Sequence, residues 1–123
     1  ISSIAGKRGV PFYGSYCASK AALNGLTESL RVELKNTDIK VLLVCPGGTD
    51  TSFYTDGLRS TENDFKLPAT NLMSADRVAR EILYNAKKGN GEIIVGSKGK
   101  ILVFLNKVSF SLTDFLLSKV FCK

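Results

Sequence analysis

The run IKVLLVC at residues 39–45, closed by Pro46-Gly47-Gly48, constrains the fold more than any other stretch of the chain. Its residues are mostly branched and apolar, and polar and apolar positions do not alternate along it. A strand with one solvated face alternates, whereas a short strand that is covered on both faces is apolar throughout. The run therefore predicts a strand buried on both faces of a parallel sheet.

Two helices and a second buried strand are predicted around this run. The first helix covers 16–34, with Ser15 as its cap and an apolar row at Ala18, Ala21, Ala22, Leu26 and Leu30. The second helix covers 74–89, where Ser74 can cap the start and Gly89 ends it, and EIIVG at 92–96 is the second strand. Because helices alternate with strands, the sequence predicts an α/β fold with right-handed crossovers.

The tail at 101–121 is apolar at 13 of its 21 positions. Lys107, Asp114 and Lys119 interrupt it, so no uninterrupted apolar span reaches the roughly 18 residues of a membrane-crossing helix. Drawn as one helix, the tail forms a row at 101, 105, 108, 112, 115 and 119 that is apolar except for Lys119. Such a row needs a partner, which can be the body of the domain, another subunit or a membrane surface.

Several classes of function are disfavoured by the composition. The chain has no histidine, which removes catalytic triads and histidine metal sites. Its three cysteines form no C-x-x-C pair, so we expect a reducing, cytoplasmic location and no metal centre. The net charge is +6, but no nucleic-acid motif accompanies it, and we expect no nucleic-acid partner. No signal peptide is present, and Ile1 reads as the end of a strand, so we expect the C-terminal part of a longer protein.

Tyr16 and Lys20 lie four residues apart, on one face of the first predicted helix. A tyrosine that exchanges protons near neutrality needs surroundings that favour its phenolate form, and a nearby ammonium favours it. The spacing alone is weak, because Tyr84 and Lys88 repeat it. We interpret this second pair as solvated helix surface, since a long loop rather than a buried strand precedes its helix.

The surroundings of the first pair are more specific. Ser3 lies 13 residues before Tyr16 at a predicted strand end, and the strand after the helix ends in CPGGTDT. The carboxyl ends of parallel strands meet at one edge of a sheet, where open α/β sheets bind ligands. A serine hydroxyl at that edge can polarise a carbonyl oxygen.

ISSIAG, YCASK and CPGGTDT, with SADRVAREIL and GEIIVG more loosely, resemble the classical short-chain dehydrogenases/reductases in order and spacing. The resemblance covers most of 1–96 and implies the C-terminal half of a Rossmann-like doubly wound parallel sheet. It makes 1–96 the catalytic and substrate-binding part, and 97–123 a basic, apolar helical extension. It also implies an NAD(P)-dependent oxidoreductase that interconverts an alcohol and a carbonyl by hydride transfer.

The resemblance assigns roles position by position. It makes Tyr16 the catalytic acid/base, Lys20 the residue that favours its phenolate and binds the nicotinamide ribose, and Ser3 the residue that holds the substrate oxygen. Pro46, Gly47 and Thr51 correspond to the turn beside the nicotinamide, with Thr49 where the family usually has valine, and 52–73 corresponds to the substrate loop.

The family's glycine-rich phosphate loop lies in an N-terminal half, and this sequence has no such motif. NAD and NADP therefore both stay open as the cofactor. The alternative interpretation is that the chain alone is inactive and serves as a structural or interaction module. The resemblance further implies a homodimer or homotetramer that uses the helix at 16–34, and the apolar tail favours a lipid-like substrate and peripheral membrane contact.

Overall fold

The structure is a computed structural model that describes residues 1–52, 72–89 and 91–122. After a short 3-10 turn, η1 (Ile4–Gly6), the chain forms helix α1 (Gly14–Glu33) and strand β1 (Leu43–Pro46). Strands β2 (Thr49–Asp50) and β3 (Met73–Ser74), helix α3 (Ala75–Lys88) and strand β4 (Glu92–Val95) follow. Helices α4 (Ser97–Val108) and α5 (Phe110–Phe121) end the described chain.

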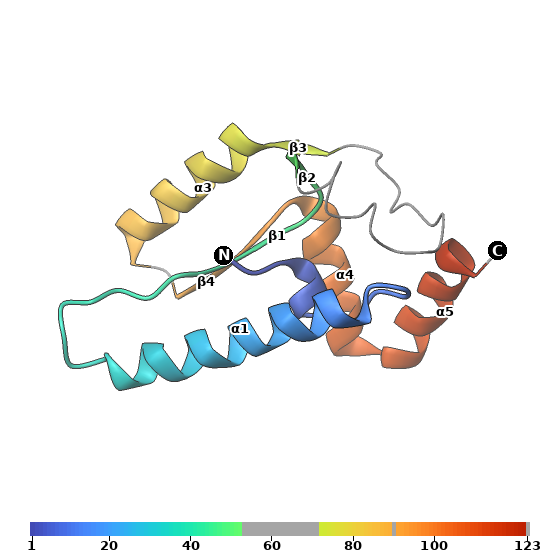
Figure 1. Cartoon of the computed structure of the whole chain (residues 1–123), viewed down its shortest axis with the longest axis horizontal. Coiled ribbons are helices and arrows are strands. Elements are labelled where there is room, and N and C mark those ends of the chain that lie inside the picture. Colours follow the sequence, from blue (N-terminus) through green and yellow to red (C-terminus); the bar gives the residue numbers. More distant parts are fainter. Residues whose placement is uncertain (53–71, 90, 123) are drawn as a thin grey trace.

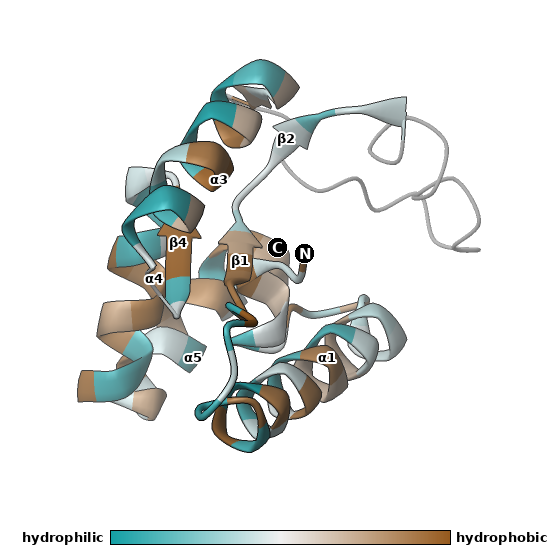
Figure 2. Cartoon of the chain, turned by 90° about the vertical axis from the view of Figure 1, so that its left-hand side faces the viewer, coloured by the Kyte–Doolittle hydropathy of each residue, from teal (hydrophilic) through white to brown (hydrophobic). Residues whose placement is uncertain are grey.

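Strands β1 and β4 pair in parallel, with Val44 opposite Ile93. Leu43, Val44 and Cys45 are all buried, which confirms the prediction of a strand covered on both faces. Figures 1 and 2 show α1 on one side of this pair and α3 on the other, as in a doubly wound sheet. The layers enclose a core cluster of Val44, Met73, Val78 and Val95.

The first strand is shorter than predicted, because 39–42 lie outside β1. Its partner strand β4 begins at Glu92, as predicted. The first hydrogen bond between the two strands joins the amide of Leu43 to the carbonyl of Gly91 at 3.0 Å, so within the described chain the residues before Leu43 have no strand beside them to pair with. The N-terminal residues lie along β1, since the Ser2 amide donates to the Val44 carbonyl at 2.7 Å.

Helix α1 begins earlier than predicted, and it is not capped by Ser15. Its flanking residue is Tyr13, which makes no side-chain capping bond. The predicted apolar row is exposed, whereas the buried residues of the helix are Cys17 and Asn24. The periodicity therefore identified one face of the helix but not its neighbour, and within the described chain this face is exposed.

Helix α3 agrees with the sequence at both ends. The Ser74 hydroxyl accepts a hydrogen bond from the Arg77 amide at 3.3 Å. Gly89 ends the helix in the left-handed region at φ 71°, which glycine adopts without steric cost. Val78 on its inner face packs into the core.

The tail is two helices rather than the single helix that we drew from the sequence. Ser109 adopts an extended backbone between α4 and α5, and its hydroxyl caps α5 by accepting from the Leu112 amide at 3.2 Å. Gly99 allows α4 to approach the body closely, since a Cβ there would lie 2.8 Å from the Ile4 side chain. Among the described residues, no helix is long and apolar enough to cross a membrane.

Candidate active site

Two adjacent serines near the N-terminus, Ser2 and Ser3, have different hydrogen-bond partners. Ser2 is buried, and its hydroxyl donates to the Lys20 carbonyl at 3.0 Å. Ser3 is half-buried, and its hydroxyl accepts from the Ala5 amide at 3.1 Å, which caps η1. Ser3, predicted from the sequence, therefore directly follows the residue that contacts the helix carrying Tyr16 and Lys20.

Tyr16 and Lys20 lie in the first turns of α1, both half-buried. The Lys20 ammonium is 5.7 Å from the centroid of the Tyr16 ring. The same contact in the second pair is shorter, at 4.4 Å between Lys88 and Tyr84. The cation contact therefore does not distinguish the pairs.

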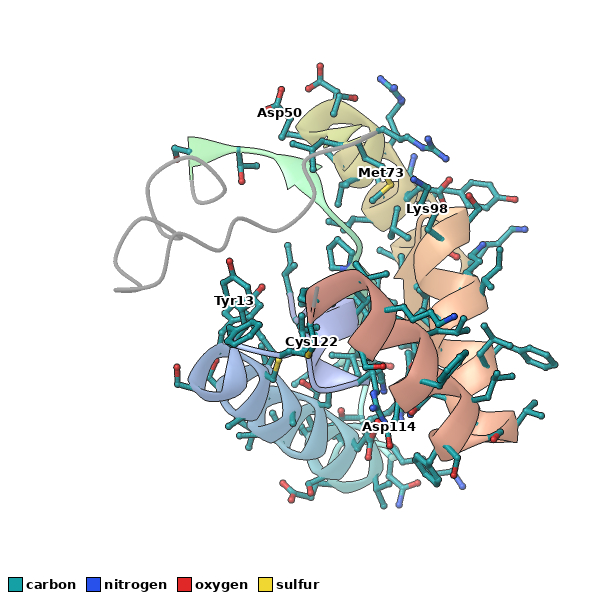
Figure 3. The ribbon with its side chains drawn as sticks, turned by 90° about the vertical axis from the view of Figure 1, so that its right-hand side faces the viewer. Tyr13, Asp50, Met73, Lys98, Asp114 and Cys122 are labelled. Atoms are coloured by element: carbon teal, nitrogen blue, oxygen red, sulfur yellow. The ribbon has the colours of Figure 1, made fainter. Side chains whose placement is uncertain are left out.

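Burial and neighbours do distinguish them. Tyr16 packs against a buried cluster of Ala5, Tyr13 and Cys17 that joins η1 to α1. Tyr84 is 57% exposed on the outer side of α3, which agrees with its interpretation as solvated surface. Tyr13 is only 4% exposed in that cluster; Figure 3 labels it at the start of α1.

The turn after β1 adjoins the Ser3 segment. The Gly47 amide donates to the Val95 carbonyl at 3.0 Å. A Cβ on Gly47 would lie 3.9 Å from the Ile4 side chain, which places the Pro46-Gly47 turn beside η1. Thr51 stands apart from this contact, exposed just beyond β2. The predicted substrate loop at 52–73 falls mostly on residues outside those described.

The cysteines beside the site are structural in character. Cys17 and Cys45 are buried, as expected of small core residues. Burial raises the pKa of the Cys45 thiol, although the positive charge of Lys7 acts in the opposite direction. A raised pKa keeps the thiol protonated near neutrality and therefore poorly nucleophilic. Within the described ranges, no group of side chains is suited to hold a metal ion.

From the sequence, no role was assigned to three residues that hold this site together, which are Ser2, Gly6 and Asn24. Asn24 is buried on α1, and its side-chain amide donates to the Gly6 carbonyl at 2.9 Å. A polar residue that shares its helix face with Lys20, one turn later, was the available signal. Its partner cannot be identified from spacing, because Gly6 lies 18 residues away.

Parallel strands between layers of helices, with polar side chains and a Pro-Gly turn close to the end of β1, define a Rossmann-like α/β protein. A family model described as short chain dehydrogenase matches residues 1–63. The chain belongs to the short-chain dehydrogenase/reductase family, which confirms the resemblance in the sequence.

Curated relatives match nearly the whole chain. A dehydrogenase/reductase SDR family protein 7-like of Dictyostelium discoideum is 37% identical over 97% of this chain and 37% of its own length. A 3-ketodihydrosphingosine reductase of the same organism is 35% identical over 98% of this chain and 38% of its own length. The chain thus spans well under half the length of these relatives.

A solved structure confirms the predicted fold class. A short chain dehydrogenase from Burkholderia cenocepacia, in complex with NADP, superposes with a TM-score of 0.70 at 21% identity. The match covers 99% of this chain and 46% of that one. Its NADP is a property of that protein.

Proposed function

We propose that the gene product containing this chain is an NAD(P)-dependent oxidoreductase that interconverts an alcohol and a carbonyl. One observation carries the proposal: η1, with Ser3, packs against the start of α1, with Tyr16 and Lys20, beside the turn that ends β1. Family membership and the NADP complex of the solved relative support it.

The proposed roles follow from the chemistry of the side chains. In carbonyl reduction, the Tyr16 hydroxyl gives its proton to the substrate oxygen, and in alcohol oxidation the phenolate takes that proton back. Ser3 donates a hydrogen bond to the same oxygen and stabilises the negative charge that develops on it. The Lys20 ammonium, 5.7 Å from the centroid of the Tyr16 ring, places a positive charge next to the group that exchanges the proton.

The donor groups of this chain fit a nicotinamide ribose and carboxamide. The Lys20 ammonium has no ion-pair partner among the described residues and can donate to ribose hydroxyls. Pro46, Gly47 and Thr51 would lie beside the carboxamide, where Thr51 supplies an exposed hydroxyl. NAD or NADP, when bound, supplies or accepts the hydride.

A second proposal concerns the chain by itself. The sequence contains no glycine-rich phosphate loop after a strand. Without backbone amides that cradle a pyrophosphate, cofactor binding loses a main source of affinity. We propose that these 123 residues alone are inactive and act only as a structural or interaction module.

Both proposals are tested by comparing the intact gene product with the isolated 123-residue chain. We expect the intact protein to oxidise NADPH or NADH with 3-ketodihydrosphingosine as the probe, and the isolated chain to show no turnover. We also expect the intact protein to sediment as a dimer or tetramer, because α1 exposes small residues that allow close helix packing (Ala18, Ala21, Ala22 and Gly25). Tight cofactor binding by the isolated chain would refute the second proposal, and no turnover by the intact protein would refute the first for this probe.

We further propose a lipid-like substrate and a cytoplasmic protein that touches membranes peripherally through 101–121. Large apolar side chains are exposed on both tail helices, including Phe104 at 65% and Phe115 at 54%. The Lys119 ammonium lies 4.6 Å from the centroid of the Phe115 ring, so a cation borders this apolar surface. The one acidic residue of the tail, Asp114, pairs with Arg8, and Figure 3 shows it on the underside of α5. Apolar side chains bordered by lysines suit an anionic lipid surface.

The membrane proposal predicts that the intact gene product co-sediments with vesicles of phosphatidylserine and phosphatidylcholine. The double change Phe104→Ser and Phe115→Ser should weaken this binding by about tenfold or more, because each phenyl ring loses its burial in lipid. Leu83→Ser is the matched control, since Leu83 is 63% exposed but lies on α3. Equal binding by the double variant and the wild type would contradict the proposal.

A further inference from the structure

Three contacts join residues 2–6 to a single turn of α1. The Ser2 hydroxyl donates to the Lys20 carbonyl at 3.0 Å. The Asn24 side-chain amide donates to the Gly6 carbonyl at 2.9 Å. Between these two bonds, Gly6 lies so close to α1 that a Cβ would be 2.8 Å from both the carbonyl carbon and the oxygen of Lys20. We call Ser2, Gly6 and Asn24 the clamp.

The close contact between Gly6 and the backbone of α1 leaves no room for a side chain at Gly6. The two nearest atoms that a Cβ would meet belong to the helix backbone at Lys20, which cannot turn away as a flexible side chain can, and the third is the side-chain nitrogen of Asn24 at 2.9 Å. A methyl group at this position would therefore push residues 2–6 away from α1. Gly9, in the same N-terminal region, is a natural comparison, because a Cβ there would meet nothing within 4 Å.

Stability alone is a poor explanation for Asn24. The residue is 6% exposed, and its Oδ1 has no hydrogen-bond partner among the described residues. A buried acceptor without a partner costs stability, and this cost offsets what the single bond from Asn24 to the Gly6 carbonyl contributes. The role that the contacts suggest for Asn24 is its hydrogen bond to the Gly6 carbonyl, which fixes the position of η1 against α1.

The clamp residues lie next to the proposed reacting groups both on the N-terminal segment and on α1. Ser3 lies between Ser2 and Gly6 in sequence, and Lys20 contributes the carbonyl that both of them approach. Ser2 is also bonded to strand β1, since its amide donates to the Val44 carbonyl at 2.7 Å. Any movement of residues 2–6 relative to α1 therefore changes the separation of Ser3 from Tyr16.

We propose that Ser2, Gly6 and Asn24 are positioning residues that set the distance between the Ser3 hydroxyl and the Tyr16–Lys20 pair. This inference rests on the proposed function. A displacement of about 1 Å at a reacting group can cost on the order of 100-fold in rate, so the clamp acts on turnover more than on binding.

The test measures steady-state kinetics of the intact gene product with NADPH and 3-ketodihydrosphingosine. Gly6→Ala should lower kcat on the order of 100-fold, while the KM for NADPH changes by less than about threefold. Gly9→Ala should leave both constants unchanged. Ser2→Ala and Asn24→Leu each remove one clamp bond and should lower kcat by a smaller factor, on the order of 10-fold.

Hydrogen exchange provides a readout that does not need turnover. In Gly6→Ala, the amides of residues 2–8 should exchange about tenfold faster, whereas those of α3 should not change. Wild-type kcat and unchanged exchange in Gly6→Ala would overturn the inference. If Gly6→Ala does not fold, wild-type kcat in both Ser2→Ala and Asn24→Leu would overturn it.

The outcomes separate this inference from the proposed function. If Tyr16→Phe keeps wild-type turnover, the proposed function fails. If Tyr16→Phe is inactive but the clamp variants keep wild-type kcat, only the positioning role fails.

Discussion

Replacing Tyr16 by phenylalanine should lower turnover of the intact gene product by about 10²–10⁴-fold, the usual contribution of a positioned general acid or base. The change removes only the hydroxyl and keeps the ring that packs beside Ala5, Tyr13 and Cys17. We therefore expect the fold to persist and NADPH affinity to change by less than about threefold. Steady-state kinetics and a fluorescence titration with NADPH measure the two effects.

The chain supplies a matched control in Tyr84→Phe. Tyr84 has the same spacing to a lysine and a shorter ring contact with it, 4.4 Å against 5.7 Å. If the spacing and the cation were sufficient for activity, both variants would lose turnover. We expect only Tyr16→Phe to do so, and comparable losses in the two variants would contradict the assignment of the site.

Leu43→Ala should lower the free energy of unfolding of the intact gene product by about 2–5 kcal/mol, because it leaves a cavity in a packed interior. Leu43 is 1% exposed at the start of β1, opposite Glu92 in the parallel pair. It is among the largest fully buried side chains of the described chain. Urea unfolding of the wild type and the variant measures the difference.

The control for this stability prediction is Leu83→Ala. Leu83 is 63% exposed on α3, so its truncation removes little buried surface and should change stability by less than about 0.5 kcal/mol. Equal losses in the two leucine variants would mean that the intact gene product buries Leu83 and Leu43 alike, which would contradict their exposed fractions of 63% and 1% in the structure.

Local signals predicted the elements whose boundaries are set by neighbouring residues. Ser74 and Gly89 bound α3 as expected, because a capping hydroxyl and a left-handed glycine act within one turn of the helix end. The same reasoning failed at Ser15, since the chain had already turned into the helix at Gly14. It also missed the break at Ser109, where the apolar pattern continues and only the capping hydroxyl marks the boundary.

For the candidate site, the sequence identified the side chains that we expect to react but not the contacts that align them. Ser3, Tyr16 and Lys20 were identified by residue type, order and spacing. Their catalytic and cofactor-binding roles, and those of Pro46, Gly47 and Thr51, remain predictions. The clamp was not predicted, because its two hydrogen bonds each join positions 18 residues apart. The sequence pattern of a helix does not indicate which distant residue a polar side chain will contact.

The sequence by itself determined the α/β class, the family and the residues that we expect to react, because burial patterns and motifs are properties of neighbouring positions. Only the tertiary structure decided which face of α1 is covered and that Gly6 must pass within contact of the Lys20 backbone. It also separated two Tyr–Lys pairs that are identical in spacing, since burial depends on what packs against each helix. Spacing along a chain sets which residues share a face, whereas contacts between distant segments set what that face meets.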